Sequence, residues 1–506
     1  MVHDQFLEKR DYSHILVLLS IALGIGVYLI ATTVLIAKDG VIYIKHAHEF
    51  SSHPVDIIKG VPFPFGYPFL IFVAHKFAML FNDHSTVFTW IYAAQSVTLI
   101  CRLITLILLF FIGKLFVGSR RSFWAVLILI ILPYPAEFGS DVLRDWPHIM
   151  FLTAGFILLL WGVKKNKYWM FGAAGLVSGF GHMIRPECAQ LIIYGILWIM
   201  MRLIFPKNDM GRVKLLYALL ILLIGFSIPV VPYVIVKGNI IPQKLELLFS
   251  SSEPRHSENI QIPNTKSDNN AYATSSMPAL ISKAIGRLAG ELSDNLMHYF
   301  ALPLVVGFYS HFRRKSEVKD IERFFIPAFV WFNIIMLILL YYDWGYMSRR
   351  HCLPLVAFLI LYVPGGLEIL AKWFEDKFSR NRLQTNHRSQ LFFFVLLVIG
   401  VVICMPKLLR PSGADKPGYR AAAKWLKENT GAEDVVAVPD LRISFYAERK
   451  GLKYATEVPE GAEYLVRIVG NEDEEEDSDS IGQEKYSVSV DNQRKSKKKL
   501  LIYRMM

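Results

Sequence analysis

Charged residues are scarce in this chain of 506 residues, since only 19% are Asp, Glu, Lys or Arg while 53% are hydrophobic. A soluble globular protein carries about 25% charged residues. The apolar residues also occur in long runs, which can cross a hydrocarbon core about 30 Å thick. The composition therefore excludes an ordinary soluble protein and predicts a polytopic membrane protein. Basic cytoplasmic loops explain the net charge of +12, so the charge does not indicate a nucleic-acid partner.

Other features are rare or missing. The four cysteines all fall in apolar segments, which favours buried hydrophobic side chains over disulfides or metal ligands: Cys101, Cys188, Cys352 and Cys404. No HExxH, CxxC, Walker or GxSxG motif occurs, which removes several classes of soluble enzyme. No Asn-x-Ser/Thr sequon occurs either, which favours a bacterial membrane. The first apolar run, 14–37, is too long for a signal peptide and is expected to stay as a membrane helix.

Apolar runs predict eleven membrane spans. They are 14–37, 88–113, 122–137, 146–163, 168–184, 187–205, 214–236, 296–312, 323–342, 351–371 and 390–409. Lys and Arg gather in alternate loops, so the positive-inside rule places those loops and the N-terminus in the cytoplasm. We therefore expect a multi-pass protein of the bacterial inner (cytoplasmic) membrane. A further apolar run near 66–82 is interrupted by polar residues and is interpreted as interfacial or re-entrant.

The membrane domain is predicted to cover residues 1–410. Two long loops on the outer side belong to it, 38–87 and 237–295. The polar part of the second loop, 250–276, is interpreted either as a mobile lid or as a disordered linker.

A small extracytoplasmic α/β domain is predicted for residues 411–506. The stretch GYRAAAKWLKENTG (418–431) has helical periodicity, and a glycine suits its C-terminus. DVVAVP (434–439) is typical of a buried strand, and YLVRIVG, KYSVSV and LLIYRM predict further strands. The fold class is thus an α-helical polytopic membrane protein with a small α/β domain at its C-terminal end.

Acidic side chains occur near the predicted outer ends of spans, where charges are costly and usually functional. Asp39 follows the first span, and Tyr43 and Ala47 come after it at helical spacing. Asp39 is interpreted either as the N-cap of an interfacial helix that begins at Gly40 or as a functional carboxylate. Asp145 opens the fourth span, where it is again either an N-cap or a functional acid.

Basic side chains occur on the same predicted side. Lys59 lies in an irregular stretch and is either a snorkelling lysine or a functional one. Arg185 and Glu187 lie at the turn of an apolar hairpin, and Arg349 and Arg350 precede the tenth span. Acids suit a base that activates a hydroxyl, and arginines suit a bound phosphate. A phosphate at membrane depth with an apolar tail is a polyprenyl phosphate. The residues therefore suggest group transfer from such a carrier to a hydroxyl.

With these motifs the chain resembles bacterial GT-C membrane glycosyltransferases of the dolichyl-phosphate-mannose–protein mannosyltransferase type, a group that includes the lipid A aminoarabinose transferases. The shared motifs are short: Asp39 with Tyr43 and Ala47, Gly66-Tyr67-Pro68, Asp145, Arg185-Pro186-Glu187, and Arg349-Arg350 with Leu353-Pro354. The resemblance extends over roughly residues 10–410. It implies a GT-C fold of about eleven transmembrane helices.

The resemblance also implies a reaction. A polyprenyl-phosphate-linked sugar would be the donor, and the sugar would pass with inversion, in one displacement, to a hydroxyl of a lipid, polysaccharide or protein acceptor. Asp39 would be the catalytic base, and Asp145 would be a second acid that supports the sugar or the acceptor. The remaining site residues would bind the substrate or its phosphate: Tyr43, Lys59, Arg185, Glu187, Arg349 and Arg350.

Alternatives remain at this stage. Many relatives carry a paired acid in the first outer loop, but Gly40 follows Asp39 here, so a reaction without a divalent metal or other cofactor is favoured. His46 and His48 point to different faces of a helix and do not predict a zinc site. The alternative functions are a transporter or flippase of lipid-linked saccharides and a non-catalytic membrane assembly protein. A transporter predicts internal repeats and midplane charges, whereas no repeat is evident. The sequence does not identify the sugar or the acceptor.

Overall fold

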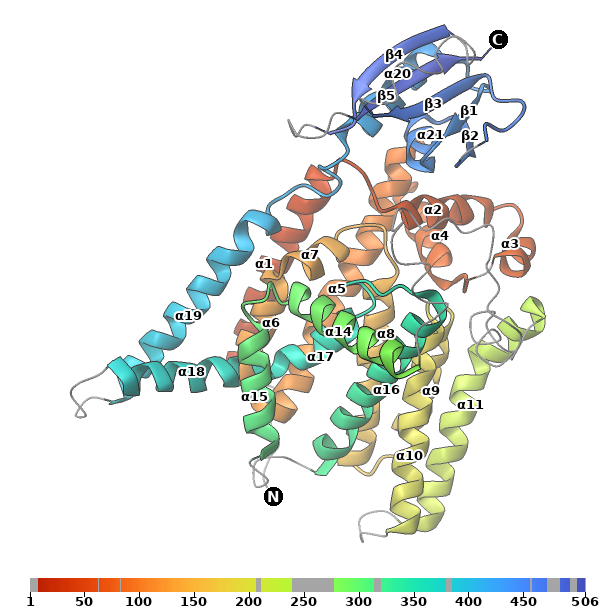
Figure 1. Ribbon diagram of the computed structural model, residues 1–506. Coiled ribbons are helices and arrows are strands. Elements are labelled where there is room, and N and C mark those ends of the chain that lie inside the picture. Colours follow the sequence, from red (N-terminus) through yellow and green to blue (C-terminus); the bar gives the residue numbers. More distant parts are fainter. Residues whose placement is uncertain are drawn as a thin grey trace.

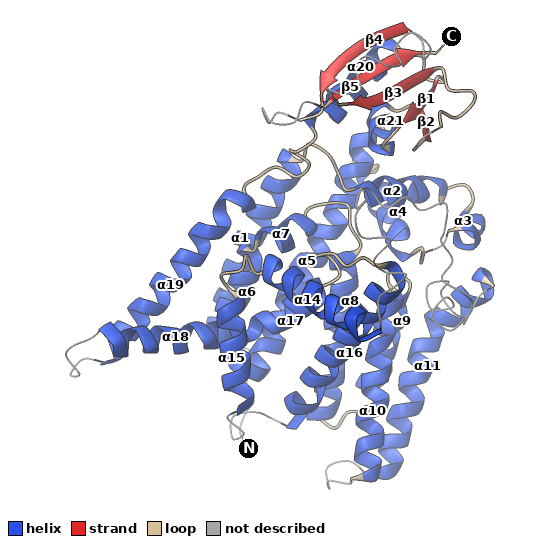
Figure 2. Cartoon of the chain, viewed as in Figure 1, coloured by secondary structure: helices blue, strands red, loops and turns tan. Residues whose placement is uncertain are grey.

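The computed structural model describes residues 8–61, 63–81, 83–205, 211–238, 277–313, 320–378, 385–455, 457–470, 483–491 and 498–505. Most of these residues are helical, and the strands gather in the C-terminal part of the chain (Figure 2). The sheet lies at one end of the helical part (Figure 1). We call that end of the helical part the sheet end. The predicted fold class, a helical polytopic membrane protein with a small C-terminal α/β region, is confirmed.

Eight helical stretches of the described chain are long and apolar enough to cross a membrane, and each coincides with an expected span. They are α1 (Lys9–Thr32), α5 (Val87–Val117), α8 (Asp145–Lys164), η1 (Pro186–Ala189) with α10 (Gln190–Ile204), α11 (Arg212–Lys237), α16 (Asp320–Trp344), α17 (Leu353–Leu359) through η2 (Ile360–Tyr362) and α18 (Val363–Phe378), and α19 (Thr385–Leu408).

The other three expected spans correspond to shorter helices. These are α6 (Ser119–Ile131), α9 (Trp169–His182) and α15 (Ala301–Arg313). They contain 13, 14 and 13 residues. A helix of this length extends only about 20 Å, which is less than the hydrocarbon thickness. The predicted number of eleven membrane helices is therefore not confirmed.

Small residues let the membrane helices approach closely. α9 packs along α8 and α11. A Cβ atom on Gly175 in α9 would lie 2.1 Å from the carbonyl oxygen of Leu222, and a Cβ atom on Gly225 in α11 would lie 2.3 Å from that of Gly172. Glycine at these positions permits the backbone contact, as in other membrane helix pairs. The helices enclose one large hydrophobic core.

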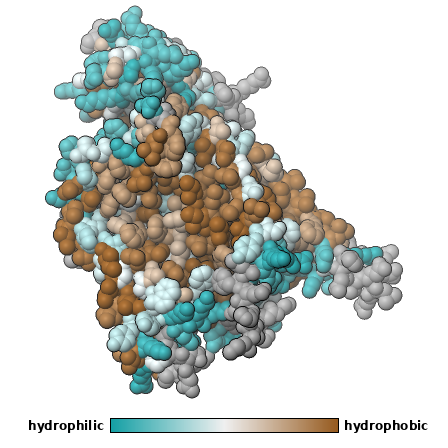
Figure 3. All heavy atoms as spheres, turned by 180° about the vertical axis from the view of Figure 1, so that it is seen from behind, coloured by the Kyte–Doolittle hydropathy of each residue, from teal (hydrophilic) through white to brown (hydrophobic). Residues whose placement is uncertain are grey.

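The surface of the helical part is apolar. Figure 3 shows a broad hydrophobic band between the hydrophilic sheet region and hydrophilic side chains at the opposite end. Large exposed apolar side chains lie on α1, α11 and α19. Soluble monomers rarely expose a continuous apolar area of this size, so we assign the band to the lipid-facing surface.

The first predicted outer loop, 38–87, folds into three short helices at the sheet end. These are α2 (Lys38–Glu49), α3 (Pro54–Gly60) and α4 (Gly66–Ala78). The run interpreted as interfacial or re-entrant forms α4, whose 13 residues are too few to span a bilayer. The short helix α7 (Pro133–Phe138) precedes α8, and α14 (Met277–Asn295) is the described part of the second predicted outer loop. The predicted lid or linker at 250–276 lies outside the described residues.

The C-terminal region combines two helices with a five-stranded sheet of order β2-β1-β3-β5-β4. Its elements are α20 (Pro417–Asn429), β1 (Val435–Val438), α21 (Leu441–Ala447), β2 (Lys450–Lys453), β3 (Tyr464–Val469), β4 (Gln483–Ser489) and β5 (Lys499–Arg504). β1 pairs in parallel with β2 and β3, whereas β5 pairs antiparallel with β3 and β4. The predicted helix and strands are confirmed, while α21 and β2, with 7 and 4 residues, were not predicted.

One hydrophobic cluster joins the sheet region to the helices at the sheet end. Leu35 and Ile44 from the N-terminal part share this cluster with Ala422 and Ile443 from the C-terminal part. Since α2 contacts α4 and α5 on one side and α21 on the other, it lies between the membrane part and the sheet region. The segment around Asp39 is thus held from both sides.

Candidate active site

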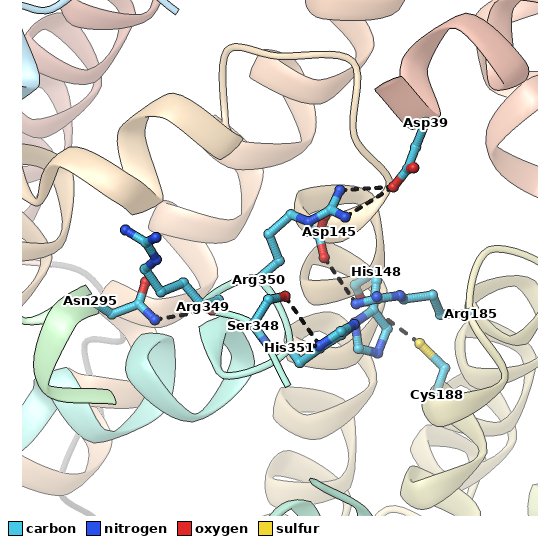
Figure 4. A network of polar contacts seen from close by, with 10 residues as sticks. All are labelled: Asp39, Asp145, His148, Arg185, Cys188, Asn295, Ser348, Arg349, Arg350 and His351. Carbon is cyan, nitrogen blue, oxygen red and sulfur yellow. Dashed lines mark hydrogen bonds and ion pairs between the residues drawn. The ribbon is translucent and has the colours of Figure 1, made fainter. Parts of the chain in front are cut away.

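Four segments bring acids and arginines together at the sheet end, as the close-up shows (Figure 4). They are the first turn of α2, the first turn of α8, the junction between α9 and η1, and the turn between α16 and α17. Asp39 lies next to Arg350, and Asp145 lies next to Arg185. We call these four residues the acid–arginine cluster. The structure thus assembles residues separated by more than three hundred positions in the sequence.

Asp39 lies in the first turn of α2 and is bound by Arg350. Both terminal nitrogens of Arg350 donate to Oδ2 of Asp39 over 3.0 Å. α2 begins at Lys38 with Ala37 as its N-cap, and the cap makes no side-chain hydrogen bond. The interpretation of Asp39 as the N-cap of a helix that begins at Gly40 is therefore wrong. The Asp39 side chain is 44% exposed, so a substrate can reach it.

Asp145 is the first residue of α8 and is bound by Arg185. Nη1 of Arg185 donates to Oδ1 of Asp145 over 3.0 Å, and the two residues are only 9% and 2% exposed. The N-cap of α8 is Arg144, so the N-cap interpretation of Asp145 is also wrong. Removal of one partner from such a buried pair leaves an uncompensated charge, which costs about 3–5 kcal/mol. The pair fixes the α9–η1 junction against the start of α8.

The two ion pairs are electrostatically coupled. Burial lowers the pKa of Arg350, but the carboxylates of Asp145 and Asp39 outweigh burial and raise this pKa above its usual value. Burial also lowers the pKa of Arg185, and Asp145 and Glu187 together outweigh it. Both guanidinium groups therefore remain charged at any physiological pH. Two partly enclosed guanidinium groups are suited to bind an anion with several oxygens.

His351 lies beside the arginines as a neutral side chain. Burial, followed by the charge of Arg185, lowers the pKa of His351 to about 3. Its Nδ1 accepts a hydrogen bond of 3.2 Å from the backbone N–H of Ser348, which a protonated Nδ1 could not do. The neutral imidazole therefore supports the turn that carries Arg350.

Several buried polar atoms around the cluster make no hydrogen bond to the described residues. They are Nη1 of Arg144, both ring nitrogens of His148, Nε of Arg185 and Oε2 of Glu187. Buried polar atoms are nearly always hydrogen-bonded to protein or ordered water. This set contains donors and acceptors, so it suits a ligand that does both, as hydroxyl groups do. These atoms around Asp145 therefore suit hydrogen bonds to a polar ligand or to ordered water.

Tyr43 forms an aromatic wall next to Asp39. It lies one turn further along α2, is 6% exposed, and packs edge-on against Phe63 and Tyr67, with ring centroids 5.3 and 5.2 Å away. The guanidinium of Arg144 lies 5.9 Å from the Tyr43 ring centroid and 5.8 Å from that of Phe63. The wall therefore combines aromatic faces with a cation, which suits a sugar ring and its phosphate.

The Gly66-Tyr67-Pro68 motif joins this wall to the hairpin that carries Arg185. The N–H of Gly66 donates to the carbonyl oxygen of Met183 over 2.7 Å. A Cβ atom on Gly66 would lie 2.5 Å from that same oxygen, so only glycine permits this approach. The motif therefore has a packing role that places α4 against the hairpin.

Two predicted site residues lie apart from the cluster. The guanidinium of Arg349 lies 4.2 Å from the ring centroid of Tyr134, and its Nε is 3.7 Å from Glu291. It points away from Asp39 (Figure 4). Lys59 is exposed on α3, and within the described part of the chain its side chain makes no hydrogen bond or ion pair with the cluster. The structure thus brings together Asp39, Tyr43, Asp145, Arg185, Glu187 and Arg350.

Sequence reasoning passed over Arg144 and His148. Arg144 precedes Asp145 by one residue, and His148 follows it by three. Positions three apart share a helix face. That spacing is the signal that could have identified His148. Asp141 is a further acid, in the segment between α7 and α8. It accepts hydrogen bonds from the N–H groups of Ala37 and Val142, over 3.0 and 2.7 Å, so it holds the chain that enters α2.

The acids of the site face arginines and do not face each other. Asp39 binds Arg350 and Asp145 binds Arg185, and the described residues contain no group of three His, Cys, Asp or Glu side chains that could hold a metal ion. The arrangement does not fit a divalent cation between the acids. Gly40 has a packing reason, since a Cβ there would lie 2.8 Å from Cβ of Val142.

Comparisons with known proteins show what the chain as a whole is similar to. Residues 63–233 match the family described as dolichyl-phosphate-mannose-protein mannosyltransferase. No curated protein sequence matches the chain. ArnT from Cupriavidus metallidurans in the apo state superposes with a TM-score of 0.57 and 11% identity, over 96% of this chain and 97% of ArnT. The same protein bound to undecaprenyl phosphate gives a TM-score of 0.56 and 12% identity, over the same shares of the two chains.

An archaeal structure shows the same likeness. The oligosaccharyltransferase of Archaeoglobus fulgidus, tethered with an acceptor peptide, gives a TM-score of 0.54 and 12% identity, over 91% of this chain and 69% of the enzyme. At such low identity these similarities establish the fold. The predicted resemblance to GT-C membrane glycosyltransferases of the mannosyltransferase and ArnT type is thereby confirmed.

Proposed function

We propose that the chain is a membrane glycosyltransferase that moves a sugar from a polyprenyl-phosphate-linked donor to a hydroxyl acceptor on the extracytoplasmic face. The proposal rests mainly on the two coupled contacts, Arg350 with Asp39 and Arg185 with Asp145, at one end of a bundle of apolar helices. The mannosyltransferase match over 63–233 and the undecaprenyl phosphate bound to ArnT support a lipid-linked donor.

In the proposed reaction, Asp39 acts as the base. Its carboxylate takes the proton of the acceptor hydroxyl while the hydroxyl oxygen attacks the anomeric carbon of the donor sugar. The new glycosidic bond forms as the bond between that carbon and the phosphate oxygen breaks, and polyprenyl phosphate leaves with the bonding electrons. One displacement at the anomeric carbon inverts its configuration. A positioned general base of this kind contributes about 10²–10⁴-fold to the rate.

Arg350 and Arg185 bind the donor phosphate in this proposal. Negative charge grows on the phosphate as the bond to the sugar breaks, and guanidinium groups that are already in place stabilise it. Arg350 also binds Asp39 when no donor is present. When the donor phosphate arrives, the Arg350 guanidinium would bind it and leave Asp39. The Asp39 carboxylate would then be able to take the proton of the acceptor. Donor binding and base activation are thus linked through one side chain.

The remaining predicted site residues have supporting roles. Asp145 keeps Arg185 in place and, together with Glu187, offers acceptors to the sugar hydroxyls. Tyr43 supports the sugar ring from α2. Lys59 and Arg349 lie outside the acid–arginine cluster and take no part in binding the donor phosphate during the reaction.

Transport of a lipid-linked saccharide is the principal competing function. A transporter needs a polar path through the membrane, with charges near the midplane of several spans. The acid–arginine cluster instead lies at or just outside the ends of spans, at residues 39, 145, 185 and 350. A non-catalytic assembly protein does not require an exposed carboxylate next to an arginine that can bind a phosphate.

A transfer assay with Asp39→Asn tests the proposal. The purified protein is placed in liposomes with polyprenyl-phosphate-linked sugars and membrane extract as the source of acceptors. The expected result is transfer by the wild type and a loss of about 10²–10⁴-fold in the variant. Asp56→Asn, at an exposed acid on α3, is the matched control and should retain full activity.

Full transfer by a folded Asp39→Asn protein would contradict the assignment of the base. Translocation of the lipid-linked sugar across the liposome membrane without transfer would support the transporter instead. Retention of activity in a chelator would agree with a reaction that needs no divalent metal.

A further inference from the structure

The C-terminal region holds the backbone that leads into Asp39. Residues 33–37 connect α1 to α2 and run directly beneath the sheet region. The carbonyl oxygen of Ser412 accepts hydrogen bonds from the N–H groups of Val34 and Leu35, over 2.9 and 3.4 Å. Gly413 has a positive φ of 71°, and a Cβ there would lie 2.7 Å from the carbonyl oxygen of Leu35. The backbone after α19 therefore packs directly against this connection, with no room for a side chain at Gly413.

Ile36 is held at both of its backbone polar groups. Its N–H donates to the hydroxyl oxygen of Tyr446 over 3.2 Å, and its carbonyl oxygen accepts from Nη1 of Arg442 over 3.3 Å. Arg442 and Tyr446 both lie on α21. Ala37 is held from the membrane side, since its N–H donates to Asp141. Each residue of this short stretch is thus fixed before α2 begins at Lys38.

A buried ion pair keeps Arg442 in position. Nε and Nη2 of Arg442 donate to the two carboxylate oxygens of Asp440 over 3.0 and 2.9 Å. Burial raises the pKa of Asp440, but the hydrogen bonds and charge of Arg442 outweigh it and hold this pKa below its usual value. Burial lowers the pKa of Arg442, and Asp440 in turn raises it above its usual value. The pair stays charged, and Lys38 adds a contact of 3.5 Å to Asp440.

The hydrogen bonds from Arg442 and Tyr446 to Ile36 are not needed to attach the C-terminal region to the helical part. The hydrophobic cluster shared by the two parts already attaches it. Arg442 and Tyr446 are buried polar groups that bond to backbone atoms only three residues before Asp39. Polar bonds between buried groups add little net stability but specify one geometry. A shift of about 1 Å in a reacting group can lower a rate about 10²-fold.

We infer that the C-terminal region is a positioning element for the proposed active site, with Arg442 and Tyr446 as positioning residues that set the location of Asp39 through the backbone of Ile36. The inference rests on the proposed function, because it assigns the reaction its geometry. It gives the sheet region a role inside the catalytic cycle, although no hydrogen bond or ion pair among the described residues joins that region to the acid–arginine cluster.

Two variants remove the bonds to Ile36. Tyr446→Phe deletes only the hydroxyl, and Arg442→Gln deletes the guanidinium. Arg449→Gln is the control, since Arg449 bonds within the C-terminal region, to Thr430 and Lys427, and makes no described contact with residues 34–38. Hydrogen exchange of the amides in 34–40 is measured on the full-length protein in nanodiscs, together with thermal unfolding, kcat and KM for the donor.

The first two variants should speed exchange of the amides in 34–40 by roughly 5–10-fold through the loss of one hydrogen bond. They should lower kcat about 10- to 100-fold and leave the donor KM within about twofold. Tyr446→Phe should unfold near the wild-type temperature, whereas Arg442→Gln leaves the buried Asp440 without its partner and should unfold at a lower temperature. Arg449→Gln should leave both the exchange and kcat unchanged. Faster exchange with an unchanged kcat would overturn the inference, as would unchanged exchange. Absence of transfer in the wild type would refute the proposed function, whereas the exchange data would still report on the contact.

Discussion

At the scale of single residues, two adjacent arginines show the limit of sequence reasoning. Arg349 and Arg350 are the same type of residue at adjacent positions, and both were predicted to bind phosphate. In the structure Arg350 turns to Asp39, whereas Arg349 turns to Tyr134 and Glu291. Consecutive residues in a turn project in different directions, and their directions depend on partners that are distant in sequence. The sequence could place both near the site, but it could not choose between them.

This difference gives a prediction with a built-in control. Arg350→Lys replaces a guanidinium that binds Asp39 through two nitrogens with a single ammonium, so the rate of transfer should fall about 10- to 100-fold. Arg349→Lys changes the same type of residue one position away and should lower the rate less than about threefold, since the Arg349 guanidinium lies against Tyr134 and Glu291 and makes no described contact with Asp39. Steady-state transfer assays on both variants measure this. Equal losses would mean that both arginines reach the donor.

A second residue-scale prediction concerns pH. The pKa of His351 is about 3 in the folded protein, below the value of about 6.5 expected when unfolded. Under acidic conditions the unfolded chain therefore binds a proton that the folded chain does not, and stability falls as the pH drops below about 6.5. Between pH 7 and pH 5 the loss of stability should be about 2 kcal/mol.

Thermal unfolding in detergent, measured at pH 7 and pH 5, tests this. His351→Gln keeps an acceptor for the Ser348 N–H and cannot be protonated, so its unfolding temperature should fall less on acidification than that of the wild type. His53→Gln, at a histidine whose side chain is 71% exposed, should behave as the wild type does. An acid sensitivity that persists unchanged in His351→Gln would contradict the assignment.

At the scale of elements, hydropathy predicted where the helices lie but not their number across the membrane. The eight long helices coincide with predicted spans, because a long apolar run in a bilayer satisfies its backbone hydrogen bonds by forming a helix. The helices α6, α9 and α15 are shorter than their apolar runs suggested. The backbone polar groups at a buried helix end can form hydrogen bonds with other parts of the protein, so a helix can end inside an apolar run. The helices of the first outer loop were harder to predict, because half-apolar stretches bind protein as readily as lipid.

Gly40 gives an element-scale prediction. Its missing side chain lets α2 lie against the 139–145 segment, where a Cβ would come within 2.8 Å of Cβ of Val142 and 3.1 Å of its carbonyl oxygen. Neither atom is the flexible end of a side chain, so Gly40→Ala should shift α2 and cost about 1–3 kcal/mol. Because Asp39 is the preceding residue, transfer should fall by at least as much as with Arg350→Lys.

Gly60→Ala is the matched control. Gly60 ends α3, and a Cβ there would meet nothing within 4 Å. Alanine is the better helix former by about 1 kcal/mol, so this variant should unfold at or slightly above the wild-type temperature and transfer normally. If Gly40→Ala unfolds and transfers as Gly60→Ala does, the close approach of α2 to Val142 does not position Asp39.

At the scale of the whole molecule, polarity divides the protein along one direction. A hydrophobic band separates the sheet region from the opposite polar end (Figure 3), and the acid–arginine cluster lies at the sheet end. The sequence predicted this division because composition changes sharply near residue 410. It did not predict that the two parts share a hydrophobic cluster. Contacts such as Arg442 with Ile36 join residues about four hundred positions apart, and no local pattern encodes them.

The sidedness of the membrane protein gives the last prediction. Lys and Arg concentrate in the loops opposite the sheet end, including 164–167 between α8 and α9, so the positive-inside rule places the sheet region outside. All four native cysteines are buried, which leaves a low labelling background. In sealed right-side-out vesicles, a membrane-impermeant maleimide should label Lys424→Cys, whose lysine side chain on α20 is 75% exposed, without permeabilisation. Lys167→Cys should react only after permeabilisation. The reverse pattern would place Asp39 and Arg350 on the cytoplasmic side, and an extracytoplasmic transfer reaction would then have to be abandoned even if the geometry of the site proved correct.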